Sequence, residues 1–84
     1  MKPILLSRHA LEQARERGAT EDEIREAVRE GEFVPAREGR RGYRLNRPFG
    51  RSWGGRIYAT KQVMPIVAEE VDRLVVVTVF VFYF

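Results

Sequence analysis

Arginine is the residue type that offers this chain most of its chemistry, and it is concentrated in one stretch. Between Arg37 and Arg56 stand seven arginines with Glu38 as the only acid, so this segment carries a net charge of +6. A guanidinium group forks onto phosphate and stacks on bases, which suits nucleic acid better than a lysine ammonium does. We therefore expect the segment to bind a polyanion, with RNA as the first partner to consider.

The same arginines have a plainer interpretation. The segment lies between two slightly acidic ones: residues 1–36 hold six basic and eight acidic side chains, and residues 57–84 hold two and three. Arginines on a sheet surface are often only a solvated face, or they dock an acidic protein. The charge pattern alone leaves these alternatives open.

Two aromatic residues lie inside the basic segment. Phe49 and Trp53 stand among glycines and arginines, the combination that single-stranded nucleic acid binding uses, at ~1–3 kcal/mol for each stacked base. The alternative is that one of them folds back over a small core. The predicted nucleic-acid-binding residues are Arg37, Arg40, Arg41, Arg47, Arg51, Trp53 and Arg56.

Metal-independent RNA cleavage would need a base, a cation for the developing phosphorane charge and an acid. The lone histidine, His9, suits proton transfer because its pKa lies nearest neutrality. The predicted catalytic set is His9, Arg17, Arg44 and Lys61, with Arg56, Tyr43 and Tyr58 as further candidates. In the competing interpretation His9 caps a backbone group or packs against the sheet edge, Arg17 braces the end of the helix onto the sheet, and Lys61 is solvated.

Several classes of site are excluded by composition. The chain has no cysteine and one histidine, so it offers neither a disulfide nor a structural zinc site, and we expect no metal and no cofactor. The apolar run Leu74–Phe84 is shorter than the about 18 residues that cross a bilayer. We expect one domain over residues 1–84, soluble and cytoplasmic, with no membrane partner.

Two helices are predicted near the start of the chain, over about 7–17 and 20–30. Ser7 is a candidate N-cap and Gly18 suits the left-handed position after the first helix. Thr20 and Glu23 form a capping box for the second helix, which Gly31 ends. Ile4–Leu6 is either a short entry strand or an apolar anchor.

Strands are predicted within 32–84. A turn is expected over 39–42, a loop over 47–55, and a strand over 56–70 that is interrupted near Lys61 or at Pro65. The last strand is apolar on both faces, with Val75, Val77, Val79 and Val81 on one side and Val76, Thr78, Phe80 and Phe82 on the other. The predicted fold is α+β, with two N-terminal helices packed on a curved antiparallel four-stranded sheet.

That last strand raises a question about partners. A strand apolar on both faces is normally covered on both, and two short helices cover only one. The second face must therefore meet its own curled sheet, a second copy of the chain, or a partner protein. A homodimer through the C-terminal strand is one expectation.

Two segments resemble a known family. ILLSRHALEQARERGATEDEIREAVREGE (residues 4–32) and LVVVTVF (residues 74–80) are similar to a family of small bacterial and archaeal domains of unknown function grouped with the RelE/BrnT-like toxins. The matching positions are Ser7, His9, Ala10, Arg17, Gly18 and Thr78. The resemblance implies a RelE-like fold and a messenger-RNA-cleaving or translation-blocking toxin neutralised by a small antitoxin, although fold analogy alone does not establish function.

Three functions follow as hypotheses. The first is an RNA-directed toxin-like protein, either an endoribonuclease or a translation inhibitor. The second is a non-catalytic homodimeric interaction module. The third is a plain nucleic-acid-binding domain without chemistry, whose affinity would fall steeply with salt.

Overall fold

Five strands form one mixed sheet in the computed structural model, which describes all 84 residues. Across the sheet the order is β1 (Ile4–Leu6), β5 (Leu74–Tyr83), β4 (Arg56–Glu69), β3 (Arg41–Trp53) and β2 (Glu32–Pro35). β1 runs parallel to β5, and the other neighbouring pairs are antiparallel. The predicted α+β class is confirmed. The predicted strand number is wrong, because the chain opens with a strand that joins the sheet beside β5.

The two predicted helices are α1 (Arg8–Arg17) and α2 (Glu21–Glu30). The Ser7 side chain accepts a hydrogen bond from the Ala10 amide, and Gly18 ends α1 in the left-handed conformation. The Thr20–Glu23 capping box is present in both directions. Neither helix is long and apolar enough to cross a membrane.

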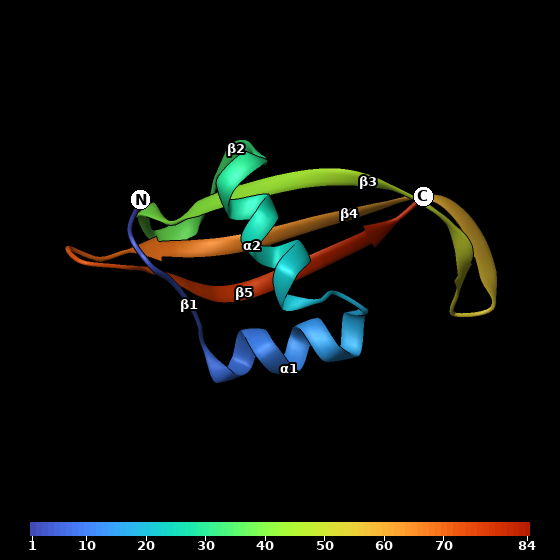
Figure 1. Cartoon of the computed structure of the whole chain (residues 1–84), viewed down its shortest axis with the longest axis horizontal. Helices are drawn as coiled ribbons and strands as arrows, with labels where there is room; N and C mark the ends of the chain where they lie inside the picture. Colours follow the sequence, from blue (N-terminus) through green and yellow to red (C-terminus); the bar gives the residue numbers. More distant parts are fainter.

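Both helices pack on the same side of the sheet. In Figure 1, α2 crosses in front of the strands and α1 lies alongside β5. Alanines of α1 and the apolar side of α2 pack against valines of β4 and β5. The hydrophobic core therefore lies between the two helices and one face of the sheet. Its members are Ile4, Ala10, Ala14, Ile24, Ala27, Val28, Val63, Val67, Val76 and Val79.

The last strand contains a bulge that changes which residues are buried. Ile66 pairs with Thr78, but Val67 pairs with Val76, so Val77 is an extra residue on β5. Because a bulge reverses the alternation of side chains, Val76 and Val79 both face the helices and are fully buried. The predicted assignment of Val76 to the face of Thr78 and Phe80 is therefore wrong.

The region predicted as a loop is the end of a long hairpin. β3 continues to Trp53 and β4 starts at Arg56, and only Gly54 and Gly55 turn between them. Pro48 pairs with Thr60 and Arg51 with Tyr58, so β3 carries one extra residue in this interval. Because a bulge lies at this point, the strand continues through Pro48 and Gly50, the residues that suggested a loop. Gly50 supplies its positive φ of 61°.

We call residues 48–58 the arm. Figure 1 shows it curving away from the sheet beyond the C-terminus. The expected interruption of the next strand does not occur either: β4 is continuous through Lys61 and Pro65. At the other end of β3, a short 3₁₀ turn over Arg37–Gly39 connects it to β2.

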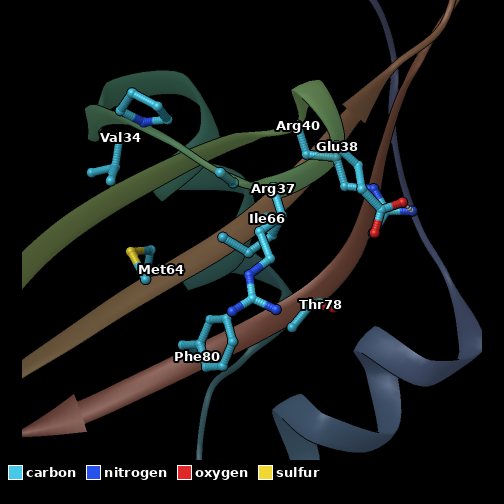
Figure 2. Close-up of a pocket in the computed structure, with 10 residues that line it drawn as sticks. Val34, Arg37, Glu38, Arg40, Met64, Ile66, Thr78 and Phe80 are labelled. Atoms are coloured by element: carbon cyan, nitrogen blue, oxygen red, sulfur yellow. Dashed lines mark ion pairs between the residues drawn. The ribbon is translucent and has the colours of Figure 1, made fainter.

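No helix covers the second side of the sheet, which we call the open face. Phe80 and Phe82 lie there on β5, and their rings stack with centroids 6.2 Å apart. A groove of about 470 Å³ crosses this face between β2 and β5. Figure 2 shows apolar side chains such as Met64, Ile66 and Phe80 along the groove, with Arg37 lying over them.

Candidate nucleic-acid interface

The arginines of the basic segment fall into two groups. Four of them are ion-paired with acids on the body of the domain. These pairs are Arg40–Glu38, Arg41–Glu69, Arg44–Glu32 and Arg47–Glu26. Arg37, Arg51 and Arg56 have no acidic partner within 4.0 Å, and the last two belong to the arm. Within the basic segment, the arginines without an acidic partner thus lie on the arm and beside the groove.

The arm also carries aromatic side chains, which gather around Tyr83 at the end of β5. The Trp53 ring stacks on the Tyr83 ring with centroids 4.9 Å apart and an angle of 18° between the planes. Phe49 and Tyr58 lie 5.1 Å and 5.9 Å from the same ring. The Arg51 guanidinium lies over Phe49, 4.8 Å from its centroid. We call these four aromatic residues the aromatic cluster.

Gly18 lets the cluster sit against the end of α1. A Cβ at this position would lie 2.6 Å from the Tyr83 hydroxyl and 2.7 Å from the Trp53 ring. The backbone there has φ of 83°, a conformation that glycine adopts readily. Tyr83 Oη donates a hydrogen bond to the Arg17 carbonyl over 2.7 Å, which ties the end of β5 to the end of α1.

Together these contacts leave a small cavity of about 180 Å³ between the arm and the body. Arg51, Trp53 and Phe49 line it from the arm. Trp53 folds back toward the body, as the alternative interpretation of the sequence described, yet 37% of its surface is exposed. One side of the ring is used by Tyr83, so a base could stack only from the other side.

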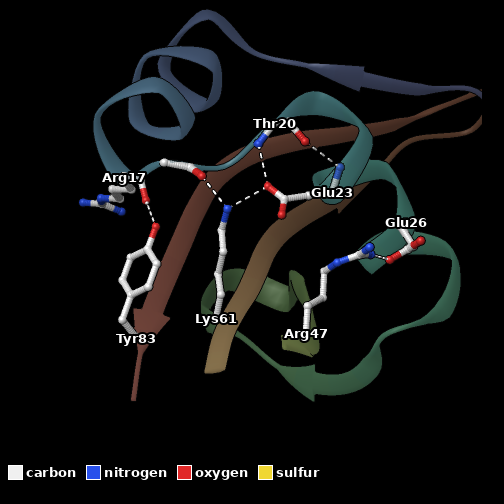
Figure 3. A network of polar contacts seen from close by, with 8 residues as sticks. Arg17, Thr20, Glu23, Glu26, Arg47, Lys61 and Tyr83 are labelled. Atoms are coloured by element: carbon white, nitrogen blue, oxygen red, sulfur yellow. Dashed lines mark hydrogen bonds and ion pairs between the residues drawn. The ribbon is translucent and has the colours of Figure 1, made fainter. Parts of the chain in front are cut away.

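Beneath the cavity lies a buried cation. Lys61 is 5% exposed, and its Nζ donates to the Gly18 carbonyl and, over 2.9 Å, to Glu23 Oε1. Figure 3 shows Lys61 rising from β4 between the end of α1 and the start of α2. The same Glu23 oxygen accepts the Thr20 amide of the capping box. One side chain therefore fixes both helix termini to the sheet.

Two pKa values are shifted in this network. Burial alone would raise the pKa of the Glu23 carboxyl, but hydrogen bonds from Lys61 and Thr20 and the lysine charge outweigh it and lower that pKa. Burial raises the pKa of the Tyr83 phenol, and the negative charge of Glu23 adds to the effect. Glu23 is therefore held as a carboxylate and Tyr83 as a neutral donor at neutral pH.

The structure does not bring the predicted catalytic residues to one point. His9 is exposed in the first turn of α1, and Arg17 lies eight residues further along, about 12 Å by helix rise. Arg44 pairs with Glu32 across β3 and β2 over 2.5 Å. Only Arg17 and Lys61 lie near each other, on either side of Gly18.

Both of those neighbours are already occupied. Lys61 is not solvated, contrary to its alternative interpretation, and its ammonium group serves Gly18 and Glu23. Arg17 donates to the Val79 carbonyl over 2.7 Å and lies over the Phe80 ring, which is the bracing contact considered above.

Sequence reasoning found the arm's arginines and Trp53 but missed Tyr83 as the centre of the cluster. Tyr83 alternates with Val79 and Val81, so its side of the sheet follows from the sequence, whereas its contacts with Phe49, Trp53 and Tyr58 depend on the arm.

The fold is a two-helix α+β domain with an aromatic, positively charged hairpin arm. A family model for a domain of unknown function (DUF4258) matches residues 6–81, and the chain belongs to that family. No curated protein and no solved structure matches the chain. The expected resemblance to a family of small domains of unknown function is confirmed in this form, and nothing in the comparisons links it to the RelE/BrnT toxins.

Proposed function

We propose that this domain binds single-stranded RNA through the arm. The observation that carries the proposal is that Arg51 and Arg56, unlike four other arginines of the basic segment, have no acidic partner and lie beside the aromatic cluster. Charge that is not offset attracts phosphate, and an exposed ring edge or face accepts a base. Residues 4–32 resemble a family of small domains grouped with the RelE/BrnT-like toxins, and the RNA-directed activity that this grouping implies favours RNA over DNA as the polyanion.

Binding is favoured over cleavage because of where the candidate catalytic groups lie. Phosphoryl chemistry needs its base, acid and cation within hydrogen-bond reach of one phosphate. His9 lies at the far end of α1 from Lys61 and Arg17, and Arg44 is on the open face. Toxin-type RNA cleavage would need these side chains to converge, so it is not part of the proposal.

A direct test is fluorescence anisotropy with a short, labelled, single-stranded RNA of mixed sequence at low salt. The variant Arg51→Gln/Arg56→Gln removes the two unpaired guanidinium groups and is expected to weaken binding by about tenfold or more. The matched control Arg41→Gln/Arg44→Gln removes the same charge from ion-paired positions and is expected to change affinity less than about threefold.

Equal losses in both double variants would show that overall charge, and not the arm, carries the affinity. No binding by the native chain at low salt would refute the proposed function. Circular dichroism on each variant establishes that the fold is unchanged before affinities are compared.

A further inference from the structure

The last residues of β5 leave one edge of the sheet without a partner. Along this edge β1 pairs with Leu74–Val76, and side chains of α1 form hydrogen bonds with the backbone of Val79. Gln13 Oε1 accepts the Val79 amide over 2.9 Å, and Arg17 donates to the Val79 carbonyl. No strand and no capping side chain follows beyond Val79. The protected part of the edge therefore ends there.

The direction of the backbone groups beyond this point follows from the ladder with β4. Phe84 and Thr60 exchange both backbone hydrogen bonds, at 3.0 Å and 2.7 Å. In an antiparallel pair such exchanges recur at every second residue, so Phe82 and Phe80 also face β4. Val81 and Tyr83 consequently direct their N–H and C=O groups to the free edge, in phase with the capped Val79.

The segment at this edge is symmetric about Phe82. It reads Phe80-Val81-Phe82-Tyr83-Phe84, with phenylalanine at both ends and in the middle. The two residues whose backbone groups point to the free edge, Val81 and Tyr83, stand on either side of Phe82. The three phenylalanines are 37%, 45% and 57% exposed, and the segment itself contains no charged residue or proline that would disfavour pairing. A segment that is symmetric in both side chains and backbone groups complements a second copy of itself.

We propose that two copies of this chain pair antiparallel along β5, about a two-fold axis at Phe82. Val81 of each copy then faces Tyr83 of the other and exchanges two backbone hydrogen bonds with it, which makes four in all. Phe82 faces Phe82, and Phe80 faces Phe84, so six phenylalanines line one continuous face of a ten-stranded sheet. Tyr83 is already held by the aromatic cluster and Arg17, so this edge needs little ordering to pair.

The size of the contact sets its expected strength. The three rings leave roughly 300 Å² exposed on each copy, and specific stable interfaces bury about 1,200–2,000 Å² in total. The dimer is therefore expected to form reversibly over the micromolar range. Sedimentation velocity of the native chain should show a rising weight-average mass with concentration, and a pure monomer at several hundred micromolar would overturn the proposal.

The register can be tested with single cysteines, because the chain has none of its own. At the axis two Phe82→Cys chains place their Cα atoms about 4.5 Å apart, within disulfide range. Oxidised glutathione, which takes up the two hydrogens of the thiols, should then convert this variant rapidly to a covalent dimer. Two Phe80→Cys chains lie about 13 Å apart at their cysteines and should cross-link slowly.

A mixture of Phe80→Cys and Phe84→Cys chains should form the mixed disulfide, since these positions face each other. Equal rates for Phe82→Cys and Phe80→Cys alone would overturn the register. Phe82→Lys should lower the mass found by sedimentation to that of a monomer, whereas Val71→Lys, an equally polar change at an exposed valine in the β4–β5 turn, should not. All of these measurements omit RNA, so their outcome is independent of the proposed RNA binding.

Discussion

At the scale of single residues, the most consequential side chain is a buried lysine. A buried ammonium is tolerated only when it is paired and hydrogen-bonded. Lys61 meets that condition through Gly18 and Glu23. Every other buried side-chain nitrogen and oxygen of the domain also has a hydrogen-bond partner. Lys61 is thus a structural cation that holds the ends of both helices.

Removing one partner of the Lys61–Glu23 pair should lower the free energy of unfolding more than removing both charges together. Glu23→Gln leaves Lys61 buried beside a neutral amide and is expected to lower the free energy of unfolding by about 3 kcal/mol. The double variant Lys61→Met/Glu23→Gln removes both charges and should lower the free energy of unfolding by less than Glu23→Gln alone. Urea denaturation measures both, with Glu21→Gln, exposed in the same helical turn, as the control.

The same pair predicts how stability depends on pH. Because the pKa of Glu23 is lowered on folding from its ordinary value of 4.5, the carboxylate stabilises the folded state fully above that value. This contribution is lost as pH falls through the lowered pKa. Urea midpoints measured from neutral to acidic pH should therefore fall less steeply for Glu23→Gln than for the native chain, and parallel curves would contradict the assignment.

Gly18 should be intolerant of any side chain. Gly18→Ala adds about 1–2 kcal/mol of backbone strain, and its Cβ would collide with Tyr83 and Trp53. We expect loss of stability together with a red shift of the emission of Trp53, the only tryptophan. Gly39→Ala is the matched control, because Gly39 also has a positive φ but open space around it. Emission that stays unchanged in Gly18→Ala would contradict the docking of the arm.

At the scale of elements, the sequence predicted helices better than strands. The caps of both helices are local patterns, since Ser7 and Thr20 bond amides three residues away. The two bulges, at Val77 and between Pro48 and Arg51, depend on which strand lies opposite and in what register. A chain read by itself does not contain that information, so the arm was predicted as a loop and Val76 was assigned to the wrong face.

The arm should be removable without loss of the fold. Arg47 and Lys61 form the next pair of the ladder, so replacing residues 48–60 by Asn-Gly closes β3 onto β4 with a two-residue hairpin turn. We expect circular dichroism to show the native mixture of helix and strand, with reduced stability because Tyr83 loses its ring partners. RNA binding measured by anisotropy should be abolished. Undiminished binding by the shortened chain would place the interface elsewhere.

Salt dependence reports how many phosphates the arm contacts. For a single strand, the logarithm of the binding constant falls with the logarithm of salt concentration by about 0.7 per phosphate contact. Arg51 and Arg56 together predict a slope of about −1.4. A slope several times steeper would show that the ion-paired arginines open and bind as well.

At the scale of the whole molecule, the net charge of +3 conceals a separation of roles. Acids of α2, β2, β4 and the 3₁₀ turn pair with four arginines of the basic segment, whereas Arg51 and Arg56 of the arm have no such partner. Composition revealed the cluster of arginines, but only the packing of helices against the sheet shows which of them meet an acid. The candidate site could thus be located from the sequence, whereas its division into paired and unpaired arginines could not.

The central claim is that a base stacks on the arm, and Trp53 allows it to be observed directly in the native chain. We would titrate single-stranded RNA into the protein and follow tryptophan emission and RNA anisotropy in the same samples. The account predicts saturable quenching of Trp53 that tracks the anisotropy and weakens with salt. RNA that binds without any change in Trp53 emission, or that does not bind, would contradict it.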